Sequence, residues 1–307
     1  MPVTIDQIMA KQFSPTLYQL AQQKESKFAS KVRRETVSRA EMAYFDTIAA
    51  EDDPEQATTR HGDTPLTEST FGRRRVIPYK WHKGTMLDSY DLARMQADPN
   101  GPVLQSFAAS FGRKKDKLIR DAALGTASIG KEGATTVNFY DESVSINGDG
   151  SVTTLGTLAA VATVAAISLA KMELMMKIFN EADVDPDITK YWAMSPKDIY
   201  DLVQLTELKS IEYNAIKAAY EGKVDFYAGF NIFWTNLLTK DAATSTAYRT
   251  IAWAQDGIIL AYIGDMTTEI DKRPDKCNEK QIYSKMDLGA VRMVGVKVHE
   301  CLNKVAL

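Results

Sequence analysis

The sequence is poor in cysteine and histidine, the residues from which disulfide frameworks and transition-metal sites are most often built. Its 307 residues include only two cysteines, Cys277 and Cys301, and three histidines, His61, His82 and His299. The cysteines form no CxxC motif, and no histidine has another histidine or a cysteine at metal-ligand spacing. We therefore expect no disulfide framework and no metal site. Both cysteines are expected to be buried or half-buried apolar residues in a protein assembled in a reducing cytoplasm.

The sequence also shows no strong charge bias, no long apolar run and no recognisable secretory-signal pattern. Its formal net charge is −3, whereas nucleic-acid-binding domains usually carry a basic excess that neutralises phosphates. The most apolar stretch, residues 155–170, is shorter than the roughly 20 apolar residues that a membrane-spanning helix needs. The first residues show no basic region followed by an apolar core. We expect neither a membrane span nor a dedicated nucleic-acid binder, and the length allows two domains or one elaborate domain.

Motifs of the common enzyme classes are missing as well. The sequence contains no GxSxG, P-loop, GxGxxG or HExxH pattern. Ser195 precedes Pro196 at an expected helix start, where capping explains the hydroxyl better than nucleophilic attack. The acidic residues Asp183, Asp185 and Asp187 are of the type that binds calcium, but they lack the glycine and terminal glutamate of an EF-hand loop. We expect no enzyme activity and no cofactor.

Helical patterns occur in several parts of the chain. Residues 101–124 carry apolar side chains at three- and four-residue steps, after a Gly-Pro start and before Gly125, a favourable C-terminal cap. Further helices are expected over residues 16–45, 157–182, 196–204, 208–221 and 255–262. The methionines of residues 157–182, which are Met172, Met175 and Met176, are typical of core packing.

Residues 71–81 alternate like a strand. One side carries Arg73, Arg75, Ile77, Tyr79 and Trp81, and the other carries Arg74, Val76 and Lys80. Pro78 removes a ladder donor, which favours an edge strand or a free hairpin. Because a hairpin alone in water is marginally stable, we expect a neighbouring molecule to cover it. Two more hairpins are expected, over residues 224–234 and between residues 281–286 and 292–299.

Two basic patches could contact nucleic acid. The first combines Arg73, Arg74 and Arg75 with Lys80, Trp81 and Lys83, and such a patch is able to hold phosphates and stack bases. For this patch we favour another interpretation over nucleic-acid binding, in which it is a charged hairpin that contacts the acidic side chains of a neighbouring molecule. The second is the helical face of Arg113, Lys114, Lys117 and Arg120.

Four segments in the last 115 residues, taken in order, resemble the major capsid proteins of tailed bacteriophages, which have the Hong Kong 97-like fold. They are Ala193–Leu202, Gly222–Ile232, Ala254–Ala261 and the closing strand from Gly289. The third segment, Ala254–Ala261, is similar to the helix that follows a variable loop in that family. The resemblance implies an α+β fold with residues 1–45 as an N-terminal arm, 46–90 as an extended loop, 91–156 as a peripheral domain with a spine helix, 157–265 as an axial domain and 266–307 as return strands of the peripheral domain.

The same resemblance implies a structural protein of the virion, assembled in the host cytoplasm. Its copies associate as pentamers and hexamers into an icosahedral head that encloses double-stranded DNA. On this interpretation the interface candidates are Arg73, Arg75, Ile77, Tyr79 and Trp81, and Arg113, Lys114, Lys117 and Arg120 face the DNA. Little room precedes the arm for a cleaved assembly domain, so a separate scaffolding protein is expected, together with a portal.

Three alternatives stay open at this point. Another phage part, such as a head–tail connector, ring or decoration protein, forms a small closed ring instead of a shell. An encapsulin-like compartment shares the fold but holds cargo enzymes. A cytoplasmic hydrolase or metal-binding domain that uses Asp183, Asp185 and Asp187 is a small species stabilised by a divalent ion.

Overall fold

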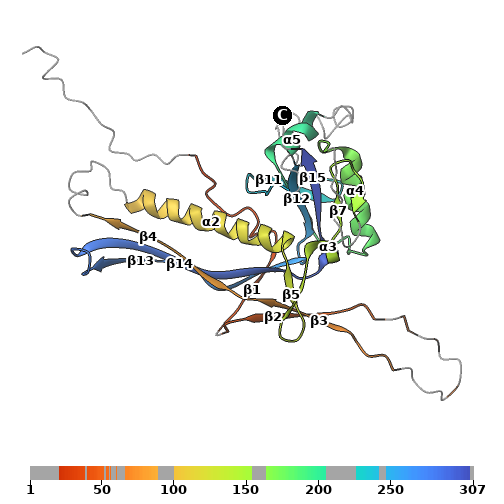
Figure 1. The fold of residues 1–307 in the computed structure, drawn as a ribbon, viewed down its shortest axis with the longest axis horizontal. Helices are drawn as coiled ribbons and strands as arrows, with labels where there is room; N and C mark the ends of the chain where they lie inside the picture. Colours follow the sequence, from red (N-terminus) through yellow and green to blue (C-terminus); the bar gives the residue numbers. More distant parts are fainter. Residues whose placement is uncertain are drawn as a thin grey trace, which may run out of the picture. The chain divides into compact units, whose positions relative to one another are not determined.

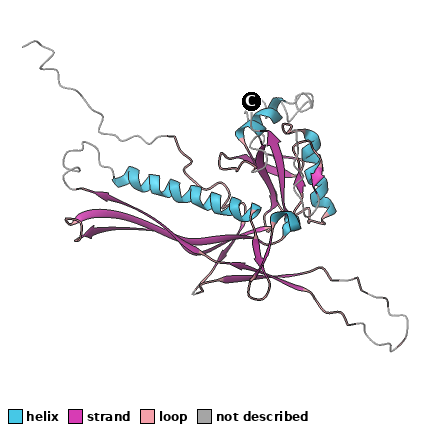
Figure 2. Ribbon diagram, viewed as in Figure 1, coloured by secondary structure: helices cyan, strands magenta, loops and turns pink. Residues whose placement is uncertain are grey.

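The computed structural model describes residues 21–38, 40–51, 53–54, 56, 60, 66–88, 100–153, 164–204, 226–241 and 247–304. Helices and strands are mixed, and strands predominate in the described residues (Figure 2). The helices are α2 (Asn100–Leu124), α3 (Phe139–Glu142), α4 (Leu169–Glu181) and α5 (Pro196–Gln204), with a 3₁₀ turn η2 at Gly295–Lys297. Within the described residues, no helix has both the length and the apolar character needed to cross a bilayer.

The described strands form three sheets (Figure 1). The first, in spatial order, contains β1 (Arg33–Thr36), β13 (Ile258–Arg273), β14 (Glu279–Arg292) and β4 (Tyr79–Leu87). The second contains β10 (Phe226–Tyr227), β11 (Phe230–Trp234), β9 (Lys190–Met194), β12 (Ala247–Ala254), β15 (Val298–Lys304), β7 (Ser145–Ile146) and β8 (Val152–Thr153). The third contains β2 (Ala43–Ile48), β3 (Phe71–Val76), β5 (Ala127–Ile129) and β6 (Thr135–Val137).

The chain divides into two compact units. One unit comprises Met1–Ser26, Lys80–Lys114 and Gly264–Asp287, and the other comprises Lys27–Tyr79, Lys115–Ile263 and Leu288–Leu307. All divisions except the one after Ser26 fall inside an element, namely β4, α2, β13 or β14, so these elements pass from one unit into the other. The division into arm, loop, peripheral and axial domains stays a prediction.

The core of the second unit lies between α4 and the seven-stranded sheet. Ser168 begins the helix as its N-cap, because its side chain accepts a hydrogen bond from the Lys171 backbone N–H. The apolar face of α4 then buries Met172, Met175 and Phe179 completely. The Phe179 ring meets the Phe230 ring edge-on at 5.4 Å. The predicted core role of the methionines is confirmed for Met172 and Met175.

The other face of this sheet is covered by the segment that precedes β1. The Phe28 ring stacks on Trp253 at 5.4 Å and meets Phe233 edge-on at 5.3 Å. The buried carboxylate of Asp116, on α2, accepts hydrogen bonds from the backbone N–H groups of Lys27 and Phe28, each at 3.1 Å. The N-terminal segment is therefore fixed to its own subunit from Lys27 onward.

Several predicted elements are wrong. Residues 33–36 and 43–48 are strands, so the helix predicted over residues 16–45 is wrong in its described part, while its first residues lie outside the described chain. Residues 255–262 form a turn and the start of β13 instead of a helix. Residues 164–168 precede α4 without helical structure. The predicted closing hairpin is wrong because β14 is continuous to Arg292, and β15 belongs to another sheet.

Other predictions are confirmed. The helix expected over 101–124 is α2, and the helix after Ser195 is α5. Ser195 and Asp198 form a reciprocal cap, since Ser195 Oγ donates to Asp198 Oδ2 at 2.6 Å and Asp198 N donates to Ser195 Oγ at 3.2 Å. The hairpin of β10 and β11 turns through Ala228 and Gly229, both with positive φ. The helix predicted over 208–221 lies outside the described residues.

A buried arginine joins three elements of the second unit. Arg292 has no exposed surface, and its Nη1 donates to the carbonyls of Ala123 and Gly125, at 2.9 and 2.8 Å. These carbonyls lie at the C-terminal end of α2, where a cation is favourable. Glu142 of α3 lies between Arg292, at 3.7 Å, and Arg74 of β3, at 2.5 Å. Burial lowers the pKa of Arg292 below its usual value, and the nearby Glu142 offsets only part of this effect. The guanidinium still stays charged.

His299 is buried in its neutral form. Its Nδ1 accepts from the Val144 N–H at 3.1 Å, and its Nε2 faces the Val296 carbonyl at 2.9 Å, which requires the proton on Nε2. Burial lowers the pKa of His299 from 6.5 to about 4. Between these two pH values the unfolded chain binds the proton more tightly, so the stability present above pH 6.5 is lost as the pH falls towards 4.

We therefore expect His299→Gln to flatten the acid side of the stability curve. Glutamine keeps one donor and one acceptor but does not titrate. As the pH falls from 6.5 to 4, the wild-type subunit should lose about 3 kcal/mol more than the variant. Urea denaturation of both proteins at several pH values measures this difference. Parallel curves would show that His299 does not gain its proton on unfolding.

Candidate assembly surfaces

The ribbon formed by β2 and β3 runs from a buried base to an exposed end. Ala43 lies opposite Val76 at the base, and both are buried. At the other end Ile48 lies opposite Phe71, and these side chains are 65% and 69% exposed. Side chains paired directly across antiparallel strands touch each other. Ile48 and Phe71 thus form an apolar pair outside the core of their own subunit, which we call the ribbon pair.

Charges on the ribbon are largely matched within the subunit. Arg73 lies opposite Asp46 in the ladder and binds it through two hydrogen bonds of 2.6 and 2.9 Å. This side-chain hydrogen bonding lowers the pKa of Asp46. Arg74 points the other way and donates to Glu142 and to the Met293 carbonyl. The alternation predicted for this strand is therefore present, but the acid that meets Arg73 belongs to the same hairpin instead of a neighbour.

The remaining interface candidates lie in different surroundings. Arg75 Nη1 donates to the Glu132 carbonyl at 3.1 Å, Ile77 is half-buried, and Tyr79 is 58% exposed. Trp81 belongs to β4 and is half-buried, and Lys114 Nζ lies 3.5 Å from the centre of its ring. The strand predicted over 71–81 is broken at residues 77–78, so these side chains do not form one continuous face.

The basic face of α2 is mostly engaged inside the subunit. Arg113 donates to the Gln22 side chain and the Gln23 carbonyl, at 3.0 and 3.1 Å. Lys114 lies on Trp81, as described above. Arg120 pairs with its neighbour Asp121 and donates to the Leu237 carbonyl. Lys117 is exposed. That these residues face DNA stays a prediction, with Lys117 as the most accessible of the four.

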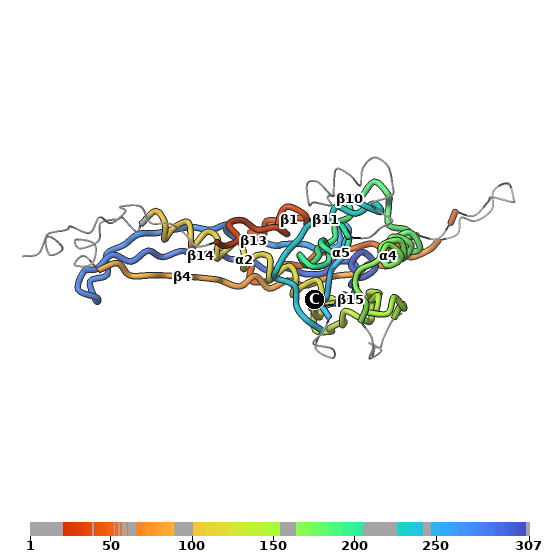
Figure 3. Tube along the Cα trace, turned by 90° about the horizontal axis from the view of Figure 1, so that it is seen from above, coloured from red at the N-terminus to blue at the C-terminus, as the bar shows by residue number. Residues whose placement is uncertain are grey.

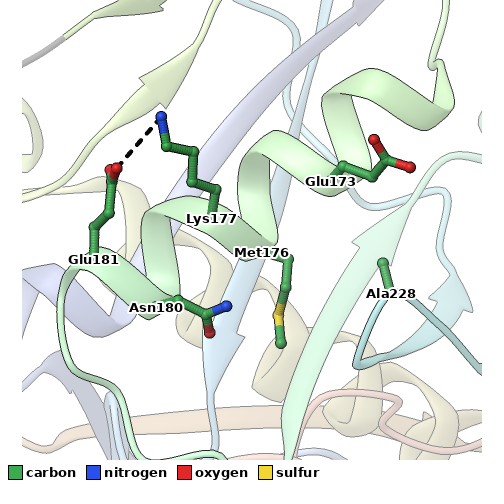
Figure 4. A pocket seen from close by; sticks show the side chains of 6 residues that line it. All are labelled: Glu173, Met176, Lys177, Asn180, Glu181 and Ala228. Atoms are coloured by element: carbon green, nitrogen blue, oxygen red, sulfur yellow. Dashed lines mark ion pairs between the residues drawn. The ribbon is translucent and has the colours of Figure 1, made fainter.

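A shallow groove runs beside α4 in the second unit. It has a volume of about 470 Å³ and is lined by Glu173, Met176, Lys177, Asn180, Glu181 and Ala228. Figure 4 shows Met176 pointing toward the segment of Ala228 and Lys177 pointing toward Glu181, with which it forms an ion pair of 3.3 Å. The groove has an apolar floor and a charged rim. Sequence reasoning assigned Met176 to the core, and it is only half-buried at this groove.

Among the residues that the structure describes, the candidates for metal or thiol chemistry are not gathered into one site. In the part of the chain that the structure describes, no group of three or more His, Cys, Asp or Glu side chains lies close enough to hold a metal ion. Cys301 is buried, and burial raises the pKa of its thiol to about 12. Cys277 is exposed, which corrects the expectation that both cysteines are buried or half-buried. His61 lies outside the described residues.

Sequence reasoning missed the ribbon pair. The expected strand begins at Phe71, but the first half of its partner strand was placed in the helix predicted over residues 16–45, so no pattern in the sequence brought Ile48 opposite Phe71. The signal that was available is weak. Ala43–Ile48 contains the strand-forming residues Tyr44, Phe45 and Ile48, and turn residues separate it from the alternating segment that starts at Phe71.

Solved structures with a similar fold are phage capsids. A cyanophage P-SCSP1u capsid structure has a TM-score of 0.72 at 15% identity, covering 100% of this chain and 96% of that chain. The capsid of Ralstonia phage GP4 has a TM-score of 0.71 at 16% identity, covering 97% and 96%. A structure from Mycobacterium phage Che8 has a TM-score of 0.69 at 12% identity, covering 95% and 96%. These likenesses confirm the expected Hong Kong 97-like α+β fold.

Comparison with curated proteins finds no match. The family model described as "Phage capsid protein" matches residues 5–305, which is almost the whole chain. Together with the capsid structures, this match favours a head protein over the ring, compartment and hydrolase alternatives. The chain belongs to the phage capsid protein family, and it is a major capsid protein that forms the icosahedral head of a phage.

Proposed function

We propose that copies of this chain associate as hexamers and pentamers, and that the β2–β3 ribbon of one copy is held by a neighbour. Residues 157–265 pack around the local axes, as an axial domain, and the peripheral segments connect neighbouring rings. The protein acts through these contacts and catalyses no reaction. Assembly takes place in the host cytoplasm with a separate scaffolding protein and a portal.

The observation that carries this proposal is the exposure of the ribbon pair. Beyond the pairing of β3 with β5 at Arg74 and Arg75, the ribbon has only two strands. Two strands alone are marginally stable, and the base of the ribbon is buried while its end is exposed. Two large apolar side chains on such an end gain burial only if another molecule covers them. Aromatic side chains that become buried in this way contribute a large share of interface energies. The residues Arg73 and Asp46 beside them give a polar rim.

We propose that the packaged DNA is held mainly by confinement. The chain carries a net charge of −3, and three of the four basic candidates on α2 already have partners within the subunit. Non-specific contacts through Lys117 therefore add only a weak, salt-dependent attraction. Trp81 and Tyr79 stay interface candidates of lower rank than the ribbon pair, because Lys114 already covers part of Trp81.

Replacing Ile48 and Phe71 together with serine is expected to prevent shell formation while the subunit stays folded. The two side chains are mostly exposed in the subunit, so its thermal unfolding should change little. The matched control is Ile270→Ser, which removes an isoleucine of 51% exposure on β13. Negative-stain microscopy and light scattering count shells, and circular dichroism follows unfolding. Normal shells from the double variant would remove the ribbon pair from the interface.

A further inference from the structure

We propose that the groove beside α4 receives Trp234 and Lys27 of the next copy in the capsomere ring. This inference rests on the proposed self-assembly and names the residues by which neighbouring copies meet. It follows from three observations: the groove itself, the exposed Trp234 ring with the Lys27 ammonium lying on it, and the positions of both surfaces on the second unit.

The groove offers an apolar floor of the size of one large side chain. Met176 lies over the β10–β11 turn, so closely that a Cβ on Gly229 would lie 2.9 Å from its terminal methyl. Methionine adapts its shape to an incoming ring and makes favourable contacts with aromatic rings. The groove's volume of about 470 Å³ lies within the range of binding clefts. An aromatic side chain therefore fits this floor.

The side chain that matches the groove is Trp234. Trp234 is the last residue of β11, and 49% of its surface is exposed in the subunit. Tryptophan is a frequent anchor residue of protein interfaces, so this exposed ring is a candidate for burial against another copy. Lys27 Nζ lies 3.2 Å from the centre of the Trp234 ring and donates to the Trp234 carbonyl at 2.9 Å. The indole and the ammonium are thus presented together as a preformed unit, which reduces the entropy lost on binding.

The charges of the two surfaces are complementary. The groove is bordered by two carboxylates and one ammonium, Glu173, Glu181 and Lys177, so its net charge is −1. Lys177 forms an ion pair with Glu181, and Glu173 lies one helical turn before Lys177. Lys27 brings one positive charge beside Trp234. Insertion of the ring places this ammonium near the rim, where it meets Glu173.

The two surfaces lie towards opposite ends of β11, because the groove includes Ala228 in the turn before β11, whereas Trp234 is the last residue of β11. Phe230 of β11 belongs to the core that α4 covers, whereas Phe233 packs against Phe28. Lys27, next to Phe28, holds the Trp234 ring at the far end of β11 from the groove. Figures 1 and 3 show β1, into which this segment leads, and α4 at separate places. Roughly 13 Å of strand also separates the two ends of β11. Trp234 does not line the groove of its own copy, so the groove is open to the Trp234 of another copy. A contact between two different surfaces generates a ring when the rotation between copies closes.

Cysteine cross-linking tests the contact. In a Cys277→Ser background, one chain carries Asn180→Cys in the groove and Asn236→Cys beside Trp234; both native side chains are exposed. A short bismaleimide should join neighbouring copies into a ladder that ends at five or six subunits on a denaturing gel. Each single variant, and a control pair of Asn180→Cys with Glu132→Cys, should give no such ladder.

Trp234→Ala supplies the second measurement. It should raise the subunit concentration needed for assembly about 30-fold, as expected for an aromatic anchor, with unchanged thermal unfolding of the subunit. If shells form normally while the cross-linked ladder is absent, the groove contact is wrong and the proposed self-assembly stands. If the wild-type chain forms no shells under any condition, the proposed function itself fails.

Discussion

Replacing Phe28 with alanine is expected to destabilise the isolated subunit by about 3–5 kcal/mol, the range for removing a buried aromatic side chain. Phe28 is 1% exposed, and it stacks on Trp253 and meets Phe233 edge-on. Its removal leaves a cavity between two aromatic rings that backbone hydrogen bonds hold in place. Urea denaturation of the unassembled subunit measures the loss.

Phe71→Ala is the matched control for this experiment. It removes the same side chain from a position that is 69% exposed, so the stability of the subunit should change by less than about 0.5 kcal/mol. Its effect is expected in assembly instead. If both phenylalanine variants unfolded alike, Phe28 would not be the residue that fixes the N-terminal segment to the sheet.

Arg292→Ala should have an effect of similar size for an electrostatic reason. The substitution removes the donors that satisfy the Ala123 and Gly125 carbonyls and one of the two cations beside Glu142. Breaking a buried ion pair by removing one partner costs about 3–5 kcal/mol, because a buried charge loses its compensation. Thermal unfolding should therefore begin at a markedly lower temperature.

Two further variants make the Arg292 result interpretable. Arg273→Ala breaks the exposed pair with Asp275 and should leave thermal unfolding nearly unchanged, because exposed ion pairs contribute little. Arg292→Ala combined with Glu142→Gln should recover part of the loss, since the carboxylate is no longer charged. No recovery in the double variant would assign the effect to the α2 carbonyls alone.

Local signals predicted the helices with clear ends. Gly101 and Pro102 start α2 and Gly125 follows it, so the predicted bounds differ from Asn100–Leu124 by one residue. Ser195 and Pro196 located α5 for the same reason. In both cases the chain carries its own stop and start residues, and these act whatever the rest of the fold does.

Elements that depend on distant partners were harder to predict. The run Ile258–Ala261 is uniformly apolar because it is buried on both faces. It belongs to β13, whose residues 259–262 pair in parallel with β1. Such a short apolar run has no period that separates strand from helix. The ribbon pair is harder still, since its register depends on how residues 43–48 meet residues 71–76, and no local pattern encodes that meeting.

The contacts of the N-terminal segment also bear on how the chain is made. Trp253 Nε1 donates to the Lys31 carbonyl across 222 positions of sequence, and Asp116 reaches Lys27 across 89. At about 5–20 residues per second, a ribosome needs roughly 10–45 seconds to supply Trp253 after Lys31. During that interval Phe28 has no stacking partner. This segment is thus synthesised well before the partners that secure it, and a nascent chain must keep it from binding elsewhere until then.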